Sequence, residues 1–234
     1  MSEHILKFNN VTKKYLGQVA LNNISFELPR GKIVALVGPN GSGKSTILKL
    51  AAGLTRPTQG SVTIRNKVAN RRIAREVAYL SESDFLYPFF TVAETLKFNA
   101  GLFADFDMRK AGEILGFMQL EPDKKVKHLS KGNRGRLKIL LALSRRAPLI
   151  LMDEPLSGLD PLVRDSIIKS MISHLDIQEQ TVFLSTHEVS EVEPILDFVI
   201  SLSEGQIIGI EEVENIRERH GLSLVDWMKE TMAK

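Results

Sequence analysis

The residues with the clearest chemical pattern form a glycine-rich loop that fits the spacing G-x-x-x-x-G-K-[ST]. They are Gly38, Pro39, Asn40, Gly41, Ser42, Gly43, Lys44 and Ser45, followed by Thr46. Glycines at this spacing let successive backbone N–H groups converge on phosphate oxygens that larger side chains would keep away. A lysine in this position reaches the β- and γ-phosphates of a nucleotide, and the adjacent hydroxyl is a ligand for Mg²⁺. The pattern therefore predicts nucleotide binding, against the alternative of a glycine-rich turn with a surface lysine.

Two acidic residues form the second group with chemical potential. Asp153 and Glu154 follow four apolar residues at 149–152, a pattern that predicts a buried strand ending in carboxylates. A carboxylate at that edge of a sheet, beside a phosphate-binding loop, can hold Mg²⁺ through water. Glu154, one residue further, points to the other side and can polarise an attacking water. A strand that merely ends in solvated acids is the alternative, and the loop upstream favours the functional interpretation.

The elements that position these groups alternate between strands and helices. Residues 33–37 form a continuous apolar run, which predicts a strand buried on both faces directly before the loop. Residues 44–52 predict a helix that Gly53 ends, so the loop lies at a helix N-terminus, where the helix dipole favours phosphate. The other predicted strands are 5–8, 21–28, 61–64, 76–80, 149–152, 181–184, 198–202 and 206–210, and the other predicted helices lie near 108–118, 130–146 and 162–175, with one more after a capping box formed by Thr91 and Glu94.

This order of elements predicts an α/β fold, a P-loop NTPase core with a mixed, largely parallel sheet flanked by helices. Period-two apolar patterns near the N-terminus add an antiparallel β-subdomain, and residues 82–145 add an inserted α-helical subdomain. One large domain is expected over residues 1–210. A helical C-terminal tail, residues 211–234, follows it.

Beside these two motifs, further segments in the same order make the chain resemble the ABC ATPases, from about residue 5 to residue 210. Residues 129–133, Leu-Ser-Lys-Gly-Asn, stand where the family's Leu-Ser-Gly-Gly-Gln signature belongs. Residues 157–160, Ser-Gly-Leu-Asp, match the family's D-loop. His187 matches its switch histidine, and Tyr15 matches the aromatic residue that stacks on adenine. A lone histidine or tyrosine is usually structural, so the order and spacing of the whole set carry the resemblance.

The resemblance implies that two subunits stack head to tail, with each ATP between the phosphate loop of one subunit and the signature of the other. Ser130 and Gly132 would contact the γ-phosphate, because a serine at a helix start leaves its hydroxyl and the following N–H groups facing outward. It also implies that Glu154 is the general base, that His187 senses the γ-phosphate, and that Asp160, next to the nucleotide, communicates across the dimer. The expected catalytic residues are Lys44, Glu154 and His187.

Three positions depart from the family pattern. Lys131 replaces the first glycine of the signature and Asn133 replaces its glutamine, whereas the serine and the second glycine are kept. Lys131 either adds positive charge near the partner's γ-phosphate or is a solvated lysine. Glu82 stands in place of the glutamine that approaches Mg²⁺ in the family. Together with Ser45 of the loop and Asp153 of the acidic pair, Glu82 is therefore a predicted metal ligand. The added negative charge either tightens Mg²⁺ or disfavours the triphosphate.

The bulk composition limits the class of protein. The 31 Lys and Arg against 28 Asp and Glu give a formal charge of +3, too small and too dispersed to indicate nucleic-acid binding. No run approaches the ~18 consecutive apolar residues of a membrane span, and no signal-peptide pattern is present. The absence of cysteines excludes disulfides and thiolate chemistry and fits a cytoplasmic protein. Any membrane role therefore requires a partner.

The departures from the family pattern resemble a branch of ABC subunits that serve bacterial exporters of antibiotics, peptides or other amphiphiles. The expected partners are a second nucleotide-binding subunit, in a homodimer or heterodimer, and an integral membrane permease on a separate chain. The permease would hold the subunit at the inner face of the cell membrane. A soluble ABC ATPase of the DNA-repair or translation type is the alternative, although the chain has no room for their coiled coils or second ATPase domain. An unrelated kinase would leave residues 129–133 and His187 without a role.

Residues 83–90, Ser-Asp-Phe-Leu-Tyr-Pro-Phe-Phe, place four aromatic residues just after Glu82. Pro88 prevents a continuous helix and Thr91 starts the next one, so a loop is expected. Exposed aromatic residues gathered on one face mark a binding surface, and the family resemblance places the permease's cytoplasmic helix at this point. We therefore expect part of residues 85–90 to be solvent-exposed and to receive the membrane partner. The alternative is that all four rings pack under the helical insertion.

Overall fold

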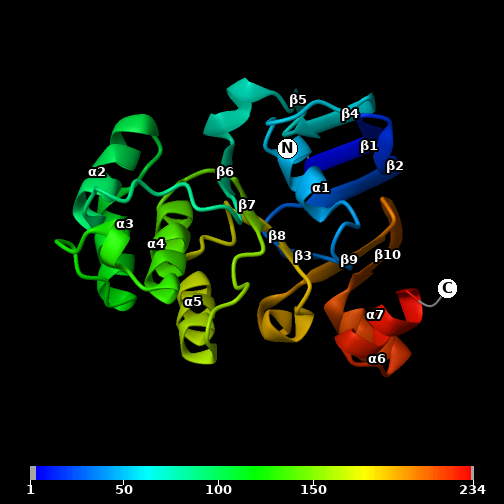
Figure 1. Cartoon of the computed structure of the whole chain (residues 1–234). Coiled ribbons are helices and arrows are strands. Elements are labelled where there is room, and N and C mark those ends of the chain that lie inside the picture. Colours follow the sequence, from blue (N-terminus) through cyan, green and yellow to red (C-terminus); the bar gives the residue numbers. More distant parts are fainter. Residues whose placement is uncertain (1–3, 233–234) are drawn as a thin grey trace.

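The computed structural model describes residues 4–232, apart from the side chains of Ala74 and His220. Within these residues an antiparallel sheet has the strand order β2-β1-β4-β5, and a larger, mixed sheet has the order β10-β9-β3-β8-β7-β6. Figure 1 shows the antiparallel sheet at the upper right, α2, α3 and α4 at the left, and the last helices below β9 and β10. The strands are β1 (His4–Tyr15), β2 (Gln18–Pro29), β3 (Ile33–Val37), β4 (Gln59–Ile64), β5 (Lys67–Val68), β6 (Val77–Leu80), β7 (Leu149–Asp153), β8 (Thr181–Thr186), β9 (Phe198–Ser203) and β10 (Gln206–Glu212). The α-helices are α1 (Lys44–Ala51), α2 (Val92–Leu102), α3 (Met108–Phe117), α4 (Lys131–Leu143), α5 (Pro161–His174), α6 (Val213–His220) and α7 (Leu224–Met232), and the short 3₁₀ turns are η1 (Arg71–Arg75), η2 (Val126–His128), η3 (Val189–Glu191) and η4 (Glu193–Ile195).

Strands β1 and β2 pair antiparallel, as their apolar patterns predict, but both run longer than predicted. The buried rings of Phe8 and Phe26 stack with centroids 4.6 Å apart. A register shift between Phe8 and Val11 then interrupts the ladder, with Asn10 at a φ of 48°. Because a bulge changes which residues face inward, the alternation in the sequence stops at Phe8 although the strand continues to Tyr15.

The central strands β3, β7 and β8 are parallel and buried on both faces, which explains their continuous apolar sequences. Strand β6 joins β7 in parallel, β9 joins β3 in parallel, and β10 returns antiparallel to β9 through the predicted hairpin. The predicted mixed, largely parallel sheet is therefore confirmed. Because parallel strands end at one edge, the residues that follow β3, β7 and β8 meet there. They are the glycine-rich loop, Glu154 and His187.

The chain between β6 and β7 forms α2, α3 and α4. The capping box at the start of α2 is confirmed, because Thr91 Oγ1 accepts from the Glu94 N–H at 3.1 Å and Glu94 Oε2 accepts from the Thr91 N–H at 2.7 Å. Among residues 4–232, none of the helices combines the length and apolar composition that a bilayer span requires. The limits proposed for the domain, 1–210, its insertion, 82–145, and the tail, 211–234, stay predictions.

Two hydrophobic clusters cover the faces of the central sheet. One contains α1 and the antiparallel sheet, and the other contains α4, α5 and the helices that precede α4. The C-terminal helices belong to the second cluster through Val213, Ile216, Leu224 and Trp227. A Cβ on Gly209 of β10 would lie 3.0 Å from the Trp227 ring, so this glycine makes room for the indole. The tail therefore packs on the core and shares its burial.

Trp227 is the only tryptophan of the chain, so its fluorescence reports the docking of the tail. Since the indole is buried in the main cluster, we expect fluorescence and far-ultraviolet circular dichroism to give the same urea midpoint. Trp227→Ala should lower the free energy of unfolding, measured by circular dichroism, by about 3 kcal/mol or more. Met232→Ala, at an exposed position of α7, is the control and should cost less than about 0.5 kcal/mol. A fluorescence midpoint well below the dichroism midpoint would mean that the tail unfolds independently.

Candidate active site

The loop between β3 and α1 has a backbone that requires its glycines. Gly41 and Gly43 have φ angles of 82° and 110°, in the left-handed region. A Cβ on Gly43 would lie 2.8 Å from both the Ala20 carbonyl oxygen and the Leu21 side chain. The hydroxyl of Ser42 is buried in this loop without a hydrogen-bond partner among the described residues. A buried hydroxyl of this kind, beside the N-terminus of α1, fits a phosphate oxygen.

Lys44, the first residue of α1, is buried, and its ammonium group lies close to the carboxyl ends of β3 and β7. Its Nζ donates to the carbonyl oxygens of Gly38 and Pro39 at 2.8 and 3.2 Å. The same atom lies 3.6 Å from Glu154 Oε1. The positive charge of Lys44 thus lies between the glycine-rich loop and Glu154, the residue that follows β7.

Asp153, the last residue of β7, is buried and held by hydroxyl groups from three other elements. Its Oδ1 accepts from Ser45 Oγ of α1 at 3.1 Å and from Ser185 Oγ of β8 at 2.8 Å. Its Oδ2 accepts from the Tyr79 hydroxyl of β6 at 3.5 Å. Burial, followed by the charge of Asp153, raises the pKa of Tyr79 to about 12, so the phenol stays protonated and donates.

Glu154 has a φ of 47°, which is rare for a residue with a side chain and is typical of functional positions. Its N–H donates to Ser185 Oγ at 3.0 Å, so one hydroxyl fixes both acids. Its carboxylate, with 10% of the side chain exposed, lies between Lys44 and His187. His187 Nδ1 is 2.8 Å from Glu154 Oε2. The two neighbouring carboxylates therefore contact different side chains, as their positions at the end of the strand predict.

The structure brings five of the predicted site residues together at one edge of the sheet: Lys44, Ser45, Asp153, Glu154 and His187. Tyr15 lies at the end of β1 and is 42% exposed, with Lys13 Nζ 4.6 Å from its ring centroid. Glu82 follows β6, and its exposed side chain shares a hollow with Glu154. The adenine and metal roles of Tyr15 and Glu82 stay predictions. The remaining predicted residues of the loop lie at its rim or in the first turn of α1: Pro39, Asn40, Gly41 and Thr46.

The segment that resembles the signature begins α4. Ser130 caps this helix, because its Oγ accepts from the Asn133 N–H at 3.2 Å. A Cβ on Gly132 would lie 2.9 Å from the Val163 side chain, so this glycine lets α4 and α5 approach each other. Asp160 caps α5 by accepting from the Val163 N–H at 3.0 Å. Within the described residues these caps stay inside their own helices, and the roles of Ser130, Gly132 and Asp160 toward a nucleotide stay predictions.

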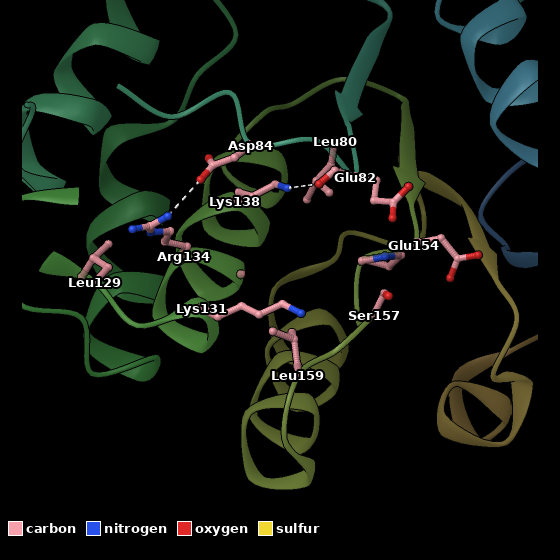
Figure 2. A pocket seen from close by; sticks show the side chains of 12 residues that line it. Leu80, Glu82, Asp84, Leu129, Lys131, Arg134, Lys138, Glu154, Ser157 and Leu159 are labelled. Atoms are coloured by element: carbon pink, nitrogen blue, oxygen red, sulfur yellow. Dashed lines mark hydrogen bonds and ion pairs between the residues drawn. The ribbon is translucent and has the colours of Figure 1, made fainter. Parts of the chain in front are cut away.

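A hollow of about 530 Å³, here called the signature hollow, lies between α4 and Glu154 (Figure 2). Lys131 extends along it, and its ammonium group lies against Gly158 of the segment that follows Glu154, where a Cβ would overlap it. The charged residues that line the hollow are Lys131, Arg134 and Lys138, together with Glu82, Asp84 and Glu154. The signature segment and Glu154 of one chain thus face the same space.

A second hollow, the aromatic groove, has a volume of about 480 Å³ and lies between β6, α2, α4 and the loop that joins β6 to α2. Within the loop, Phe85, Tyr87 and Phe89 are 47%, 46% and 62% exposed, whereas Leu86 packs against the core. The predicted exposure of part of residues 85–90 is confirmed. The alternative, in which all the rings are buried, is wrong because a loop this short follows the surface.

Two residues of the site are not evident from the motifs, Ser185 and Tyr79. Ser185 lies opposite Asp153 in the β7–β8 ladder, and Tyr79 lies opposite Leu151 in the β6–β7 ladder. The available signal for Ser185 is a polar residue near the end of an apolar strand. For Tyr79 the sequence offers no comparable signal, since a tyrosine is ordinary in a strand.

Comparison with known proteins agrees with this arrangement. Residues 21–157 match the family model described as ABC transporter. The lantibiotic transport ATP-binding protein SrtF of Streptococcus pyogenes is 33% identical over 223 residues, which cover 92% of this chain and 95% of SrtF. A solved ATP-binding subunit of an ABC transporter aligns with a TM-score of 0.84 and 28% identity over 98% of this chain and 100% of that chain. The dimeric structure of MJ0796, a bacterial ABC transporter cassette, aligns with a TM-score of 0.80 and 28% identity over 89% and 98%.

These matches favour the transporter interpretation over a soluble repair or translation ATPase. Cassettes of this kind dimerise and associate with the membrane components of transporters. The glycine-rich loop, Asp153 and Glu154 lie within the matched region, and the fold agrees over nearly the whole chain. The chain belongs to the ABC transporter family, as an ATP-binding subunit that hydrolyses ATP to drive transport.

Proposed function

We propose that this subunit works in a head-to-tail dimer in which the partner's Ser130 and Gly132 complete the nucleotide site. The main support is the position of Glu154, held between Lys44 and His187 beside the glycine-rich loop. The N-terminus of α4 carries N–H groups and a serine hydroxyl that suit a phosphate brought by another chain. A dimeric cassette among the structural relatives, MJ0796, supports the pairing of two subunits.

Glu154 is the proposed acceptor of the proton from the attacking water. His187 Nδ1 bonds to one carboxylate oxygen and Lys44 lies near the other, so the carboxylate is oriented from both sides. Such fixed orientation is what makes a general base effective, since no reorganisation is needed during the reaction. Lys44 also brings positive charge to the β- and γ-phosphates, and His187 contacts the γ-phosphate. Asp160 connects the two subunits near this point, and Tyr15 stacks on the adenine.

Mg²⁺ is proposed to bind at Ser45, Asp153 and Glu82, whose hydroxyl and carboxylate oxygens are the ligands it prefers. Bound there, Mg²⁺ supplies positive charge that offsets the charge developing on the transferred phosphate. Ser185 holds Asp153 Oδ1 and the Glu154 backbone at the same time. Its hydroxyl therefore orients the Asp153 carboxylate and holds the backbone that carries Glu154.

Ser185→Ala tests this positioning role. The substitution removes a donor to Asp153 and the acceptor of the Glu154 N–H, so we expect kcat for ATP hydrolysis to fall about tenfold or more. The matched control is Ser201→Ala on β9, because Ser201 is equally buried and its hydroxyl has no partner among the described residues. The control should keep the wild-type kcat. An unchanged kcat in Ser185→Ala would exclude the role.

Glu154→Gln tests the general base and the dimer together. It keeps the size of the side chain but removes the proton acceptor, so turnover should fall by about 100-fold or more while ATP binding persists. The ATP-bound dimer should then accumulate in light scattering. Adding Ser130→Ala should lower the dimer fraction, and Lys44→Ala should lose ATP affinity with its charge-assisted phosphate contact. Near-normal turnover, or a dimer indifferent to Ser130→Ala, would contradict the proposal.

The aromatic groove is proposed to receive a cytoplasmic helix of a separate membrane permease, which would hold the subunit at the inner face of the cell membrane. An apolar groove rimmed by exposed rings fits the apolar face of an amphipathic helix. The likeness to SrtF, a lantibiotic transport protein, supports export of a peptide or another amphiphile as the work of the complete transporter.

Tyr87→Asp, in the groove, and Phe89→Asp, whose ring centroid lies 5.6 Å from that of Tyr87, test this contact. A carboxylate in an apolar contact is costly to desolvate, so both variants should lose the permease on co-purification and abolish transport. The isolated variants should still bind ATP, because the groove lies away from the glycine-rich loop. Phe117→Asp is the control, an equally exposed aromatic position on α3 outside the groove. Retention of the permease by both variants would place the partner elsewhere.

A further inference from the structure

Leu80 and Lys138 line both the signature hollow and the aromatic groove, so they form the wall between them. Leu80 is a buried apolar residue at the end of β6. Lys138 lies on α4, about two turns after the Ser130 cap. It belongs to none of the motifs, and of the two described residues that form this shared wall it is the charged one.

The ammonium group of Lys138 is bonded to main chain on one side and lies over a ring on the other. Its Nζ donates to the carbonyl oxygens of Glu82 at 2.9 Å and Ser83 at 3.2 Å. The same atom lies 5.6 Å from the ring centroid of Phe85, within the range of a cation–π contact. Figure 2 shows Lys138 reaching from α4 to the segment that carries Glu82. Two of its three donors therefore fix two consecutive peptide groups of that segment.

The surroundings of Lys138 make these contacts necessary. Burial lowers the pKa of the amine, against the opposing charges of Asp84 and Glu82. A partly desolvated ammonium group is stable only with its donors satisfied. One turn earlier on α4, Arg134 Nη1 lies 3.3 Å from Asp84 Oδ2, a half-exposed pair that adds little on its own. Both basic residues nevertheless attach the same segment to the same helix.

We propose that Lys138 is a positioning residue that connects the aromatic groove to the Glu82 side of the nucleotide site. It holds the peptide groups of Glu82 and Ser83 against α4, with Phe85 of the groove on its other side. When a partner bound in the groove displaces the Phe85 ring, the segment that places the Glu82 carboxylate in the hollow shared with Glu154 moves with it. The step through Phe85 rests on the proposed permease contact, whereas the positioning of Glu82 is a property of the isolated chain.

The first test uses the isolated subunit and the variants Lys138→Met and Lys138→Arg. Methionine keeps the apolar stem and removes the donors, so amide hydrogens of Ser83 and Leu86 should exchange about tenfold faster. The kcat should fall about threefold or more with an unchanged KM for ATP, because the glycine-rich loop is untouched. Arginine keeps the donors and should restore both values. Lys97→Met, an exposed lysine of α2, is the control and should change neither. Equal thermal unfolding midpoints would show that all the variants fold.

A double-mutant cycle with Glu82→Gln tests whether Lys138 acts through Glu82. Residues that act through one another give non-additive effects. Glu82→Gln should therefore change kcat and the half-maximal Mg²⁺ concentration in the wild-type background but much less in Lys138→Met. Equal effects in both backgrounds, no effect of Glu82→Gln in either, or wild-type exchange at Ser83 in Lys138→Met would overturn the proposal.

The last experiment separates this proposal from the permease proposal. In the complete transporter, Lys138→Met should keep the permease bound but lose about threefold or more of its stimulation of ATP hydrolysis. Lys138→Arg and Lys97→Met should keep the stimulation. If Tyr87→Asp retains the permease, the groove proposal fails while the results on the isolated chain stand. If Tyr87→Asp loses the permease but Lys138→Met behaves as wild type in every measurement, only the positioning role of Lys138 fails.

Discussion

Asp153 is a carboxylate buried at the end of an apolar strand, where water cannot supply its hydrogen bonds. An isolated charge in such a place costs on the order of several kcal/mol. Hydroxyl groups of Ser45, Ser185 and Tyr79 supply the donors, and each comes from a different element, α1, β8 and β6. These donors meet only because the parallel strands end at one edge and α1 starts there. The need of the buried Asp153 carboxylate for hydrogen-bond donors therefore links the topology of the sheet to the chemistry at its edge.

The buried Asp153 carboxylate also determines the direction in which the Glu154 side chain points. A second carboxylate directly after a buried one would compete for the same donors, and two like charges in contact are destabilising. The left-handed φ of 47° separates them, because the chain turns and directs Glu154 to Lys44 and His187. The strain of this backbone is offset by the bond from its N–H to Ser185. A residue that is strained and fixed on three sides has one orientation, which suits the role of proton acceptor proposed for Glu154.

How well the sequence predicts a feature of this molecule depends on how far apart in sequence the interacting residues are. The glycine-rich loop, the capping box and the acids after 149–152 rest on local spacing, and the structure has the predicted elements at these places. The contacts of Ser185 and Lys138 join residues 32 and 56 positions apart in sequence, and they exist only after the strands and α4 have packed. Strand β1 extends beyond its predicted end for a related reason, since a bulge interrupts the period-two pattern of its sequence.

The two departures from the family pattern that carry charge are understood best together. Lys131 adds a positive charge where the signature has glycine, and Glu82 adds a negative charge where the family has glutamine. Both line the signature hollow, so the two changes bring opposite charges to one space. Positive charge near a helix N-terminus is unfavourable for the helix itself. Lys131, Arg134 and Lys138 recur at spacings of three and four on one side of α4, and Glu82, Asp84 and Glu154 line the same hollow. Of these acids Asp84 pairs with Arg134, and Lys138 bonds to the carbonyl oxygens of Glu82 and Ser83, so two basic residues of α4 attach the segment at Glu82 to this helix.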